Sequence, residues 1–431
     1  MACSSNLSER PASPPPDRPG GASRDAAAPA TVPRPVAEGR PTSPERDAGR
    51  PARPFVPQRL PDGYLHYTDA CLPGTQVTIA AVGDLLVHHE LQRQALKAKN
   101  GFVAIWEPVV DLLAKAELTY ANLEGPTARG LDRQGNKTPD PGKRFDDKVY
   151  TGYPRFNYHP SIARDLVTSG VDIVSMANNH ALDRAALGLD RTLDVLDSAG
   201  LNHFGARRQG TDAPWYVVTE INGVALAWVG CTLYTNQPDK HGQVMHCFKK
   251  PDRVTPLVRK LAQTPTIDAV IVTPHMGKEY VPNPGKKEQK LVRKLLDAGA
   301  LAVIGSHPHV LQPWEKHVTP DGRETFTLFS LGNFCSHQRP LPRRSSMILF
   351  LGLTKGHDGV TRVNGARYVP LHVRMEGDME RFFVEAIDRA GGPQDSRALT
   401  TAMFGELNII APEDPIVTNP HCDPTWPHHV K

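Results

Sequence analysis

The chain has 431 residues, of which 39% are hydrophobic, and its 50 basic and 46 acidic residues give a formal net charge of +4. This length allows one large domain or two ordinary ones, and the near balance of charge without a dense basic run argues against a nucleic-acid-binding protein. No stretch approaches the roughly 20 consecutive apolar residues that a membrane-spanning helix needs.

Residues 1–60 are dominated by Pro, Ala, Arg, Ser, Gly and Asp, so we predict a disordered tail or tether that cannot offset its ordering entropy. Cys3 precedes this Ser/Pro-rich segment, as the modified cysteine of a cleaved bacterial lipoprotein does. If translation starts upstream of Met1, we expect a lipid-anchored protein of the cell envelope, and otherwise a cytoplasmic one.

Residues 75–375 are expected to form the folded domain, with 376–431 as a C-terminal extension that packs on it and ends loosely. Within the domain, strand-like runs alternate with amphipathic helical segments. We predict strands at 77–84, 118–125, 171–180, 214–232 (a hairpin around Asn222-Gly223), 267–275, 300–309, 324–334 and 346–354. We predict helices at 106–116, 161–170, 189–200 and 286–299. This alternation predicts an α/β layered fold, and the hairpin and late strands predict mixed sheets.

The segment from 125 to 160 is polar and rich in Gly and Pro. Long ordered loops in compact domains are usually functional, so we expect this one to cover the site.

Polar side chains stand where five strand-like segments end. These ends read Gly83-Asp84, Asn122-Leu123-Glu124, Asn178-Asn179-His180, Pro274-His275 and Ser306-His307-Pro308-His309. Each alone has an ordinary explanation, such as a helix cap or a hydrogen-bonded core histidine. Together they indicate a site, because ligands collect at the carboxyl ends of strands in α/β sheets.

These candidate ligands are His, Asp, Glu and Asn without Cys, which suits a divalent ion such as Mn, Fe, Zn, Mg or Ca. Residues i and i+2 of a strand point the same way, so we expect His307 and His309 to face one metal region, with Pro308 stiffening the link. The number of candidates allows one or two ions, as in the two-metal sites that hydrolyse phosphate esters.

The six cysteines show no C-x-x-C spacing, which argues against a structural zinc site. Cys231 and Cys247 flank one loop and could pair in an oxidising compartment, although buried free thiols are the more common outcome. The tail from 419 to 430, with three His and one Cys, is interpreted as loosely packed and not as a second metal site.

The motifs "NLEGP", "ANNHALD", "DAGALAVIGSHPHVLQP" and "SLGNF" together resemble the CapA family of bacterial capsule (poly-γ-glutamate) synthesis over roughly residues 77–355. This resemblance implies the calcineurin-like metallophosphatase fold, in which two mixed β-sheets are sandwiched and flanked by helices. It also implies a divalent metal site at one edge of the sheets.

The resemblance assigns roles residue by residue. The implied metal ligands are Asp84, Glu124 in place of the bridging carboxylate, Asn179, His275, His307 and His309. His180 is implied as the acid near the substrate, and Asp183 is expected to orient it from the same face of a helix that begins at "HALD".

One ligand of the metallophosphatase pattern is missing. The classical sequence is Asp-x-His, whereas Asp84 is followed by Leu85 and Leu86, so we predict that His88 substitutes. Weaker candidates for contacts with the substrate are Asn122, Arg155 and Asn333.

The function indicated first is a metal-dependent hydrolase of bacterial envelope polymer biosynthesis. We expect an anionic polymer, peptide or phosphoester as its substrate, capsule synthesis or export proteins as possible partners, and no nucleic acid. Two alternatives stay open, namely a metal-dependent peptide epimerase that uses His/Asp acid–base pairs and a non-catalytic subunit of capsule export or assembly.

Overall fold

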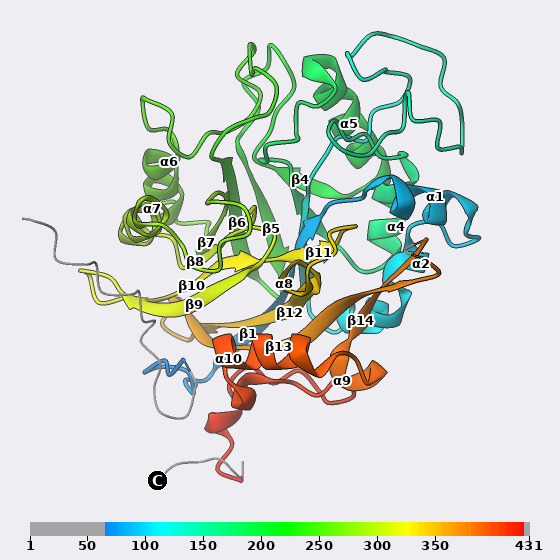
Figure 1. Ribbon diagram of the computed structural model, residues 1–431. Helices are drawn as coiled ribbons and strands as arrows, with labels where there is room; N and C mark the ends of the chain where they lie inside the picture. The colour runs from blue at the N-terminus through cyan, green and yellow to red at the C-terminus, as the bar shows by residue number, and fades with distance from the viewer. Residues whose placement is uncertain (1–64, 379, 426–431) are drawn as a thin grey trace, which may run out of the picture. The chain divides into compact units, whose positions relative to one another are not determined.

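The computed structural model describes residues 65–378 and 380–425 (Figure 1). The predictions for the tail 1–60, including the role of Cys3, fall outside these residues. None of the helices in the described part has both the length and the apolar character that crossing a membrane requires.

The first sheet has eight strands in the order β14-β13-β12-β1-β2-β3-β4, with β11 paired to β1 outside this path. Strands β1 to β4 run parallel, whereas β12, β13 and β14 continue the sheet in antiparallel pairs. The bounds are β1 (Gly74–Leu85), β2 (Leu118–Leu123), β3 (Ile173–Ser175), β4 (Asn202–Phe204), β11 (Asn333–Cys335), β12 (Ser345–Gly356), β13 (Thr361–Glu376) and β14 (Arg381–Ala386).

The second sheet has six strands in the order β5-β6-β7-β8-β10-β9. Its four inner strands are parallel and its two edge strands are antiparallel, so both sheets are mixed, as predicted. The bounds are β5 (Tyr216–Ile221), β6 (Val224–Thr232), β7 (Ala269–His275), β8 (Ala302–Ile304), β9 (Leu311–Val318) and β10 (Glu324–Leu331). The predicted hairpin is present, and Asn222 (φ 52°) and Gly223 (φ 75°) form its turn.

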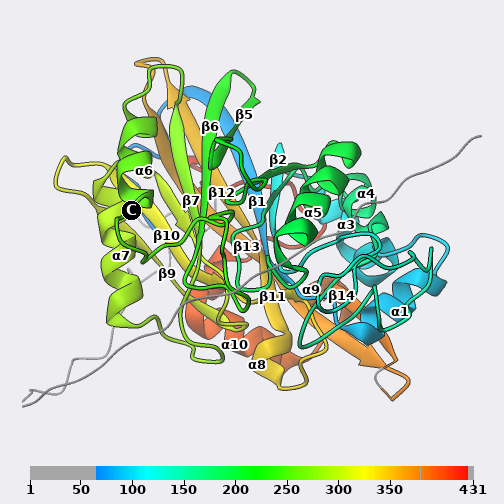
Figure 2. The same ribbon diagram turned by 90° about the horizontal axis from the view of Figure 1, so that it is seen from above.

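Helices cover the outer faces of both sheets (Figure 2). On the first sheet lie α1 (His89–Lys97), α2 (Val103–Trp106), α3 (Val110–Leu113), α4 (Ser161–Thr168) and α5 (Ala185–Ala199). On the second lie α6 (Val254–Ala262) and α7 (Lys286–Asp297). The remaining helices are α8 (Leu341–Arg344), α9 (Ile387–Ala390), α10 (Gln394–Phe404) and the 3₁₀ turns at Glu107–Val109, Glu406–Asn408 and Pro420–Cys422.

Three hydrophobic cores separate these four layers. Along β1 the side chains alternate, so that Ile79 and Ala81 enter the core between the sheets while Ala80 and Val82 face the helices. A strand buried on both faces must be apolar at successive positions, which is why this segment reads as a continuous hydrophobic run. The architecture confirms the predicted sandwich of two mixed sheets flanked by helices.

Two predicted elements are wrong in detail. The single helix expected over 106–116 is broken into α2, a 3₁₀ turn and α3, because Pro108 has no amide hydrogen for a helical hydrogen bond. The single strand expected over 324–334 is split at Gly332 (φ 69°), where the chain leaves the second sheet as β10 and enters the first as β11.

This crossover determines where Asn333 lies. The amide of Asp84 donates to the Gly332 carbonyl at 3.0 Å, and Asn333 pairs in register with Asp84. Position 83 is close enough to the crossover that a Cβ there would lie 2.0 Å from the Gly332 oxygen, so only glycine fits. The two glycines therefore bring the ends of β1 and β10 into contact.

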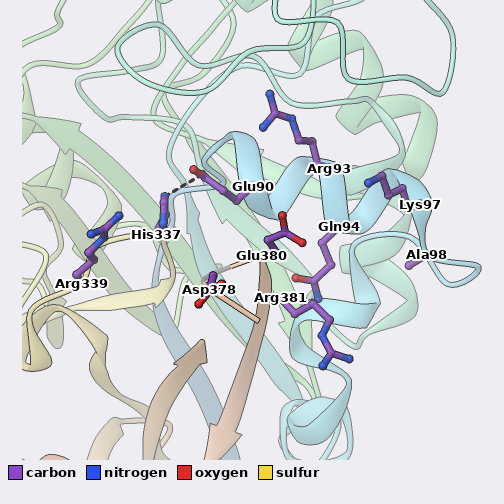
Figure 3. A pocket seen from close by; sticks show the side chains of 10 residues that line it. All are labelled: Glu90, Arg93, Gln94, Lys97, Ala98, His337, Arg339, Asp378, Glu380 and Arg381. Carbon is purple, nitrogen blue, oxygen red and sulfur yellow. Dashed lines mark ion pairs between the residues drawn. The ribbon is translucent and has the colours of Figure 1, made fainter. Parts of the chain in front are cut away.

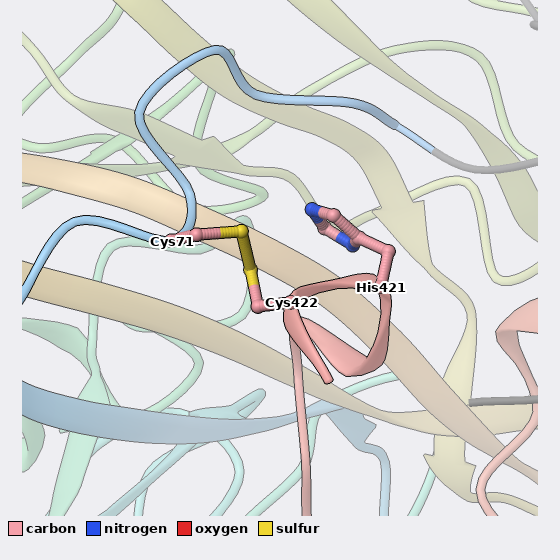
Figure 4. A group of neighbouring side chains, drawn as sticks. All are labelled: Cys71, His421 and Cys422. Carbon is pink, nitrogen blue, oxygen red and sulfur yellow. A yellow bond between two sulfur atoms is a disulfide. The ribbon is translucent and has the colours of Figure 1, made fainter. Parts of the chain in front are cut away.

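The expectation that buried free thiols are the more common outcome is wrong for four cysteines, which form two disulfides. Cys231 is bonded to Cys247 and Cys71 to Cys422, whereas Cys335 is buried and free. The pair Cys71–Cys422 joins segments 351 residues apart, which no spacing in the sequence could reveal (Figure 4). Because this disulfide uses both thiolates, the cluster that it forms with His421 is not a metal site.

Candidate metal centre

The predicted ligands come together at one edge of the two sheets. The parallel strands β1, β2, β3, β7 and β8 all end at this edge, and each is followed or terminated by a polar side chain. The five acidic and imidazole side chains are buried, with at most 3% of their surface exposed: Asp84, Glu124, His275, His307 and His309.

These side chains form two overlapping groups with the spacing of metal ligands. One group is Glu124, His307 and His309, and the other is Asp84, Glu124 and His275; in each, one ligand atom per residue lies within 4.8 Å of the others. Glu124 belongs to both groups, which is the position that a bridging carboxylate takes between two ions. The arrangement is therefore compatible with one or two divalent ions.

Glu124 supplies the observation that tests this interpretation. Both of its carboxylate oxygens are buried without a hydrogen-bond partner among the described residues. Its Oε1 lies 3.4 Å from Nε2 of His275 and 3.8 Å from Nε2 of His309. Burying a carboxylate without hydrogen bonds is costly, and a divalent cation between these groups would satisfy it. The residues present thus fit a divalent metal.

His275 has its two ring nitrogens in different surroundings. Nδ1 lies 2.9 Å from the Ser306 hydroxyl and 3.2 Å from the Asn122 amide, which hold the ring in place. Nε2 faces Asn179 Oδ1 at 2.9 Å and His307 Nδ1 at 3.1 Å. Hydrogen bonds on the far nitrogen are typical of a metal-ligating histidine, because they fix its tautomer and orientation.

His309 is oriented in the same manner. Its Nδ1 lies 3.1 Å from Asp84 Oδ2 and 3.0 Å from Asn333 Oδ1, which leaves Nε2 on the side of Glu124. The amide of Asn333 in turn donates to the Arg343 carbonyl at 2.9 Å. Asn333 is fully buried, and its contacts within the protein hold the His309 ring in place.

The predicted reason why His307 and His309 converge is wrong. Strand β8 ends at Ile304, and both histidines lie beyond it with positive φ angles of 100° and 56°. Non-glycine residues seldom adopt this conformation, and where they do they concentrate at functional sites. The two imidazoles therefore meet through two left-handed residues on either side of Pro308 and not through the period of a strand.

Burial and charge set the protonation of the centre. Burial lowers the pKa of His275 and of His307 to about 3, so both imidazoles are neutral at physiological pH and can bind a metal. Burial and the charge of Asp84 raise the pKa of Glu124 to about 8. Burial lowers the pKa of His309, but the charges of Glu124 and Asp84 outweigh it and raise the pKa to about 9.

We expect metal affinity to rise as the pH increases from 6 to 8. Below these raised pKa values, the metal-free pair of Glu124 and His309 holds a proton that a metal must displace. Affinity should increase by about tenfold per pH unit for each proton displaced and level off once the groups are deprotonated. Calorimetric titrations in buffers of different ionisation enthalpy measure the released protons, and a pH-independent affinity would contradict the assignment of Glu124 and His309 as ligands.

His180 and Asp183 form a buried pair beside these ligands. His180 Nδ1 lies 2.7 Å from Asp183 Oδ2, which also accepts from the Phe156 amide at 2.8 Å. The pair lies in a turn before α5 and not in the predicted helix, since α5 begins at Ala185. Burial lowers the pKa of His180, but the Asp183 carboxylate outweighs this effect and the pKa lies above its ordinary value.

Two further predicted residues lie close to the ligands without being ligands. Asn122 is buried and donates to Asp84 Oδ1 at 2.7 Å, a contact that holds this candidate ligand in place. His88 belongs to neither ligand group; its Nδ1 lies 2.9 Å from the Leu86 carbonyl oxygen and 3.3 Å from the His337 backbone nitrogen. Arg155 lies outside the ligand groups, next to Asp183, in the wall of a cavity.

A loop that covers the centre from the second sheet was not predicted. Asn236 places its side-chain amide 3.2 Å from His180 Nδ1 and donates from its backbone to the Asn179 carbonyl at 2.7 Å. The Tyr234 ring stands edge-on to the His307 ring, with centroids 5.8 Å apart. The only signal in the sequence was the pair of cysteines that flanks this loop.

A separate cavity of about 590 Å³ opens between α1 and the turn after β13 (Figure 3). It is lined mainly by charged side chains of both signs, including Arg93, Lys97 and Arg381, and Glu90 pairs there with His337 at 2.8 Å. None of the candidate metal ligands lines it, so it is distinct from the centre.

Comparison with known proteins identifies the family to which the chain is similar. Residues 78–338, more than half of the chain, match the profile of the family described as "Bacterial capsule synthesis protein PGA_cap". The chain is 25% identical over 289 residues to the "Capsule biosynthesis protein CapA" of Bacillus anthracis, covering 64% of either chain. It is 28% identical over 320 residues to the "PGA biosynthesis protein CapA" of Bacillus subtilis (strain 168), covering 72% of this chain and 77% of the relative.

Among solved structures, the chain resembles the 5'-nucleotidase precursor of Thermus thermophilus. The TM-score is 0.45 at 15% sequence identity, and the match covers 76% of this chain and 59% of the other.

Proposed function

Because this chain belongs to the family of bacterial capsule synthesis proteins, we propose that it is a divalent-metal-dependent hydrolase of envelope polymer biosynthesis. The observation that carries the proposal is the buried carboxylate of Glu124, which two groups of ligands share and which has no hydrogen-bond partner among the described residues. In a scaffold without metal, such a group would cost desolvation free energy that a bound divalent ion would offset.

The residues divide into those that would hold the ion and one that would move a proton. Asp84, Glu124, Asn179, His275, His307 and His309 would hold one or two ions. A bound divalent ion supplies Lewis-acid polarisation of a phosphoryl or carbonyl oxygen and activates water as the nucleophile. His180, oriented through Nδ1 by Asp183, would give the proton on Nε2 to the leaving group.

The substrate class and compartment are further parts of this proposal. The name of the Bacillus subtilis relative refers to PGA biosynthesis, so an anionic polymer such as poly-γ-glutamate is the natural first substrate to test. Two disulfides support an oxidising compartment, such as the cell envelope, because such bonds are rare in the cytosol. Proteins of capsule synthesis or export would then be the partners.

The test combines metal analysis with turnover of two substrates. The full chain, purified with its disulfides intact, should contain one or two divalent ions and should cleave either an aryl phosphodiester or poly-γ-glutamate. Protein treated with chelator is the control, and activity should return on addition of one of Mn, Fe, Zn or Mg.

Two results would contradict the hydrolase. No turnover of either substrate with any of the four metals would favour the non-catalytic subunit. Incorporation of solvent deuterium at a peptide Cα without bond cleavage would favour the epimerase.

A further inference from the structure

A cavity of about 250 Å³ lies beside the His180–Asp183 pair. Asp183 lines it, together with side chains from the covering loop and from the segment between β2 and α4. Four of the lining side chains are basic or can be: Arg133, Arg155, Lys240 and His241. We call this space the Arg155 cavity.

The two acidic groups in its wall are paired with histidines that do not line the cavity, Asp183 with His180 and Asp239 with His246. Oδ2 of Asp183 pairs with His180 and accepts the Phe156 amide, while its Oδ1 is buried and has no hydrogen-bond partner among the described residues. Asp239 accepts the amides of Gln243 at 2.8 Å and Val244 at 3.2 Å, and it lies 3.5 Å from His246. Among the described ion pairs, neither carboxylate is paired with a basic side chain of the cavity.

Two of the basic side chains, in contrast, have no carboxylate partner among the described ion pairs, namely Arg155 and Lys240. The Arg155 guanidinium donates to two neutral acceptors, the Arg133 carbonyl at 2.8 Å and Gln237 Oε1 at 3.1 Å. Lys240 is exposed and has no carboxylate partner among the described ion pairs, while Arg133 pairs with the exposed Asp147. An arginine that meets only neutral acceptors retains its full charge and free N–H groups for an anionic oxygen group.

The same loop connects this cavity to the candidate reaction centre. Residues 232–246 are closed into a loop by the Cys231–Cys247 disulfide, and the loop base also pairs Cys247 N–H with the Thr232 carbonyl at 2.8 Å. Gln237, Asp239 and Lys240 line the cavity, whereas Asn236, one residue earlier, contacts His180. A ligand in the cavity would therefore lie next to Asp183, the carboxylate that pairs with the His180 imidazole.

We propose that the Arg155 cavity binds an anionic oxygen group, a carboxylate or a phosphate, that the substrate carries at a distance from the bond that reacts. The assignment of this anion to the substrate rests on the proposed function. The binding of an anion by the cavity is independent of the proposed function. The disulfide-closed loop holds the site in place before binding, so little ordering is required when the anion enters.

The test uses two simple anions and no turnover. The full chain, as purified with its disulfides intact, is titrated by calorimetry with glutarate and with inorganic phosphate at constant ionic strength. Arg155→Gln and Lys240→Gln are compared with Lys143→Gln, which removes an exposed charge from the same long loop as Arg155 but outside the cavity. Anion bound directly to a metal is common to all variants, so only the differences between them report on the cavity.

We expect Arg155→Gln to weaken binding of at least one anion by about tenfold, because a charge-assisted pair is lost. Lys240→Gln, whose side chain makes no described contact, should weaken it by several-fold, and Arg155→Lys should restore part of the loss. The anion that is affected identifies the group as carboxylate or phosphate. Equal affinity in all variants, or no saturable binding of either anion, would overturn the proposal.

Metal content measured on the same samples separates this proposal from the proposed function. Loss of anion binding in Arg155→Gln from a protein that contains no metal would retain the cavity and reject the hydrolase. A metal-containing, active protein with unchanged anion binding in both variants would reject the cavity and retain the hydrolase.

Discussion

Replacing His307 and His309 together by alanine is expected to abolish metal binding by the purified protein. Each imidazole has a nitrogen among the atoms that converge on Glu124 and His275, and removing both leaves one of the two ligand groups with a single carboxylate. Loss of outer hydrogen-bond partners already costs about 10–100-fold in metal affinity, so loss of two direct ligands should exceed this. Bound metal is measured by elemental analysis after dialysis.

The control is His317→Ala, which removes a half-buried imidazole from β9 that none of the ligand groups contains. It should leave the metal content unchanged. Because a buried double substitution can disturb folding, the thermal unfolding of both variants is compared, and His309→Gln serves as a milder variant that keeps a polar side chain. A folded double variant with undiminished metal content would disprove the metal assignment.

The second large effect is expected from His180→Gln. Loss of a positioned proton donor typically slows a reaction by about 10²–10⁴-fold, and this variant should retain its metal because His180 is in neither ligand group. The defect should be smallest for a substrate with a p-nitrophenolate leaving group, which departs without a proton. Asp183→Asn should act in the same direction, because it removes the negative charge that orients the imidazole and raises its pKa.

The pH dependence has a definite sign. His180 must be protonated to act as an acid, so activity should fall as the pH rises through its raised pKa. Because weakening the Asp183 charge lowers that pKa, the fall should move to lower pH in Asp183→Asn. A His–Asp pair of similar distance, His203 with Asp197 at 2.9 Å, lies near the surface and provides the matched control His203→Gln. If turnover on a poor leaving group is undiminished in His180→Gln, His180 is not the acid.

Local sequence patterns were sufficient for most of the layers. Apolar runs with a period of two and helical runs with a polar face determine which faces a segment must bury, and that is a property of the segment itself. The carboxyl ends of the strands carried the ligands because parallel strands share one edge, a rule that holds for any α/β sheet. Asp84, Glu124 and His275 could therefore be proposed without knowing how the sheets pack.

The orientation of these side chains and the contacts that fix them were determined only by the tertiary structure. The left-handed backbone at His307 and His309, the crossing of the chain at Gly332 and the partner of Cys71 all depend on segments far apart in the sequence. The same is true of Asn236, which reaches His180 only because the disulfide-closed loop lies across the edge of the first sheet. Residue type and spacing determine what a segment can contribute, but contacts over long sequence separations are set by the packing of the whole domain, which no local pattern encodes.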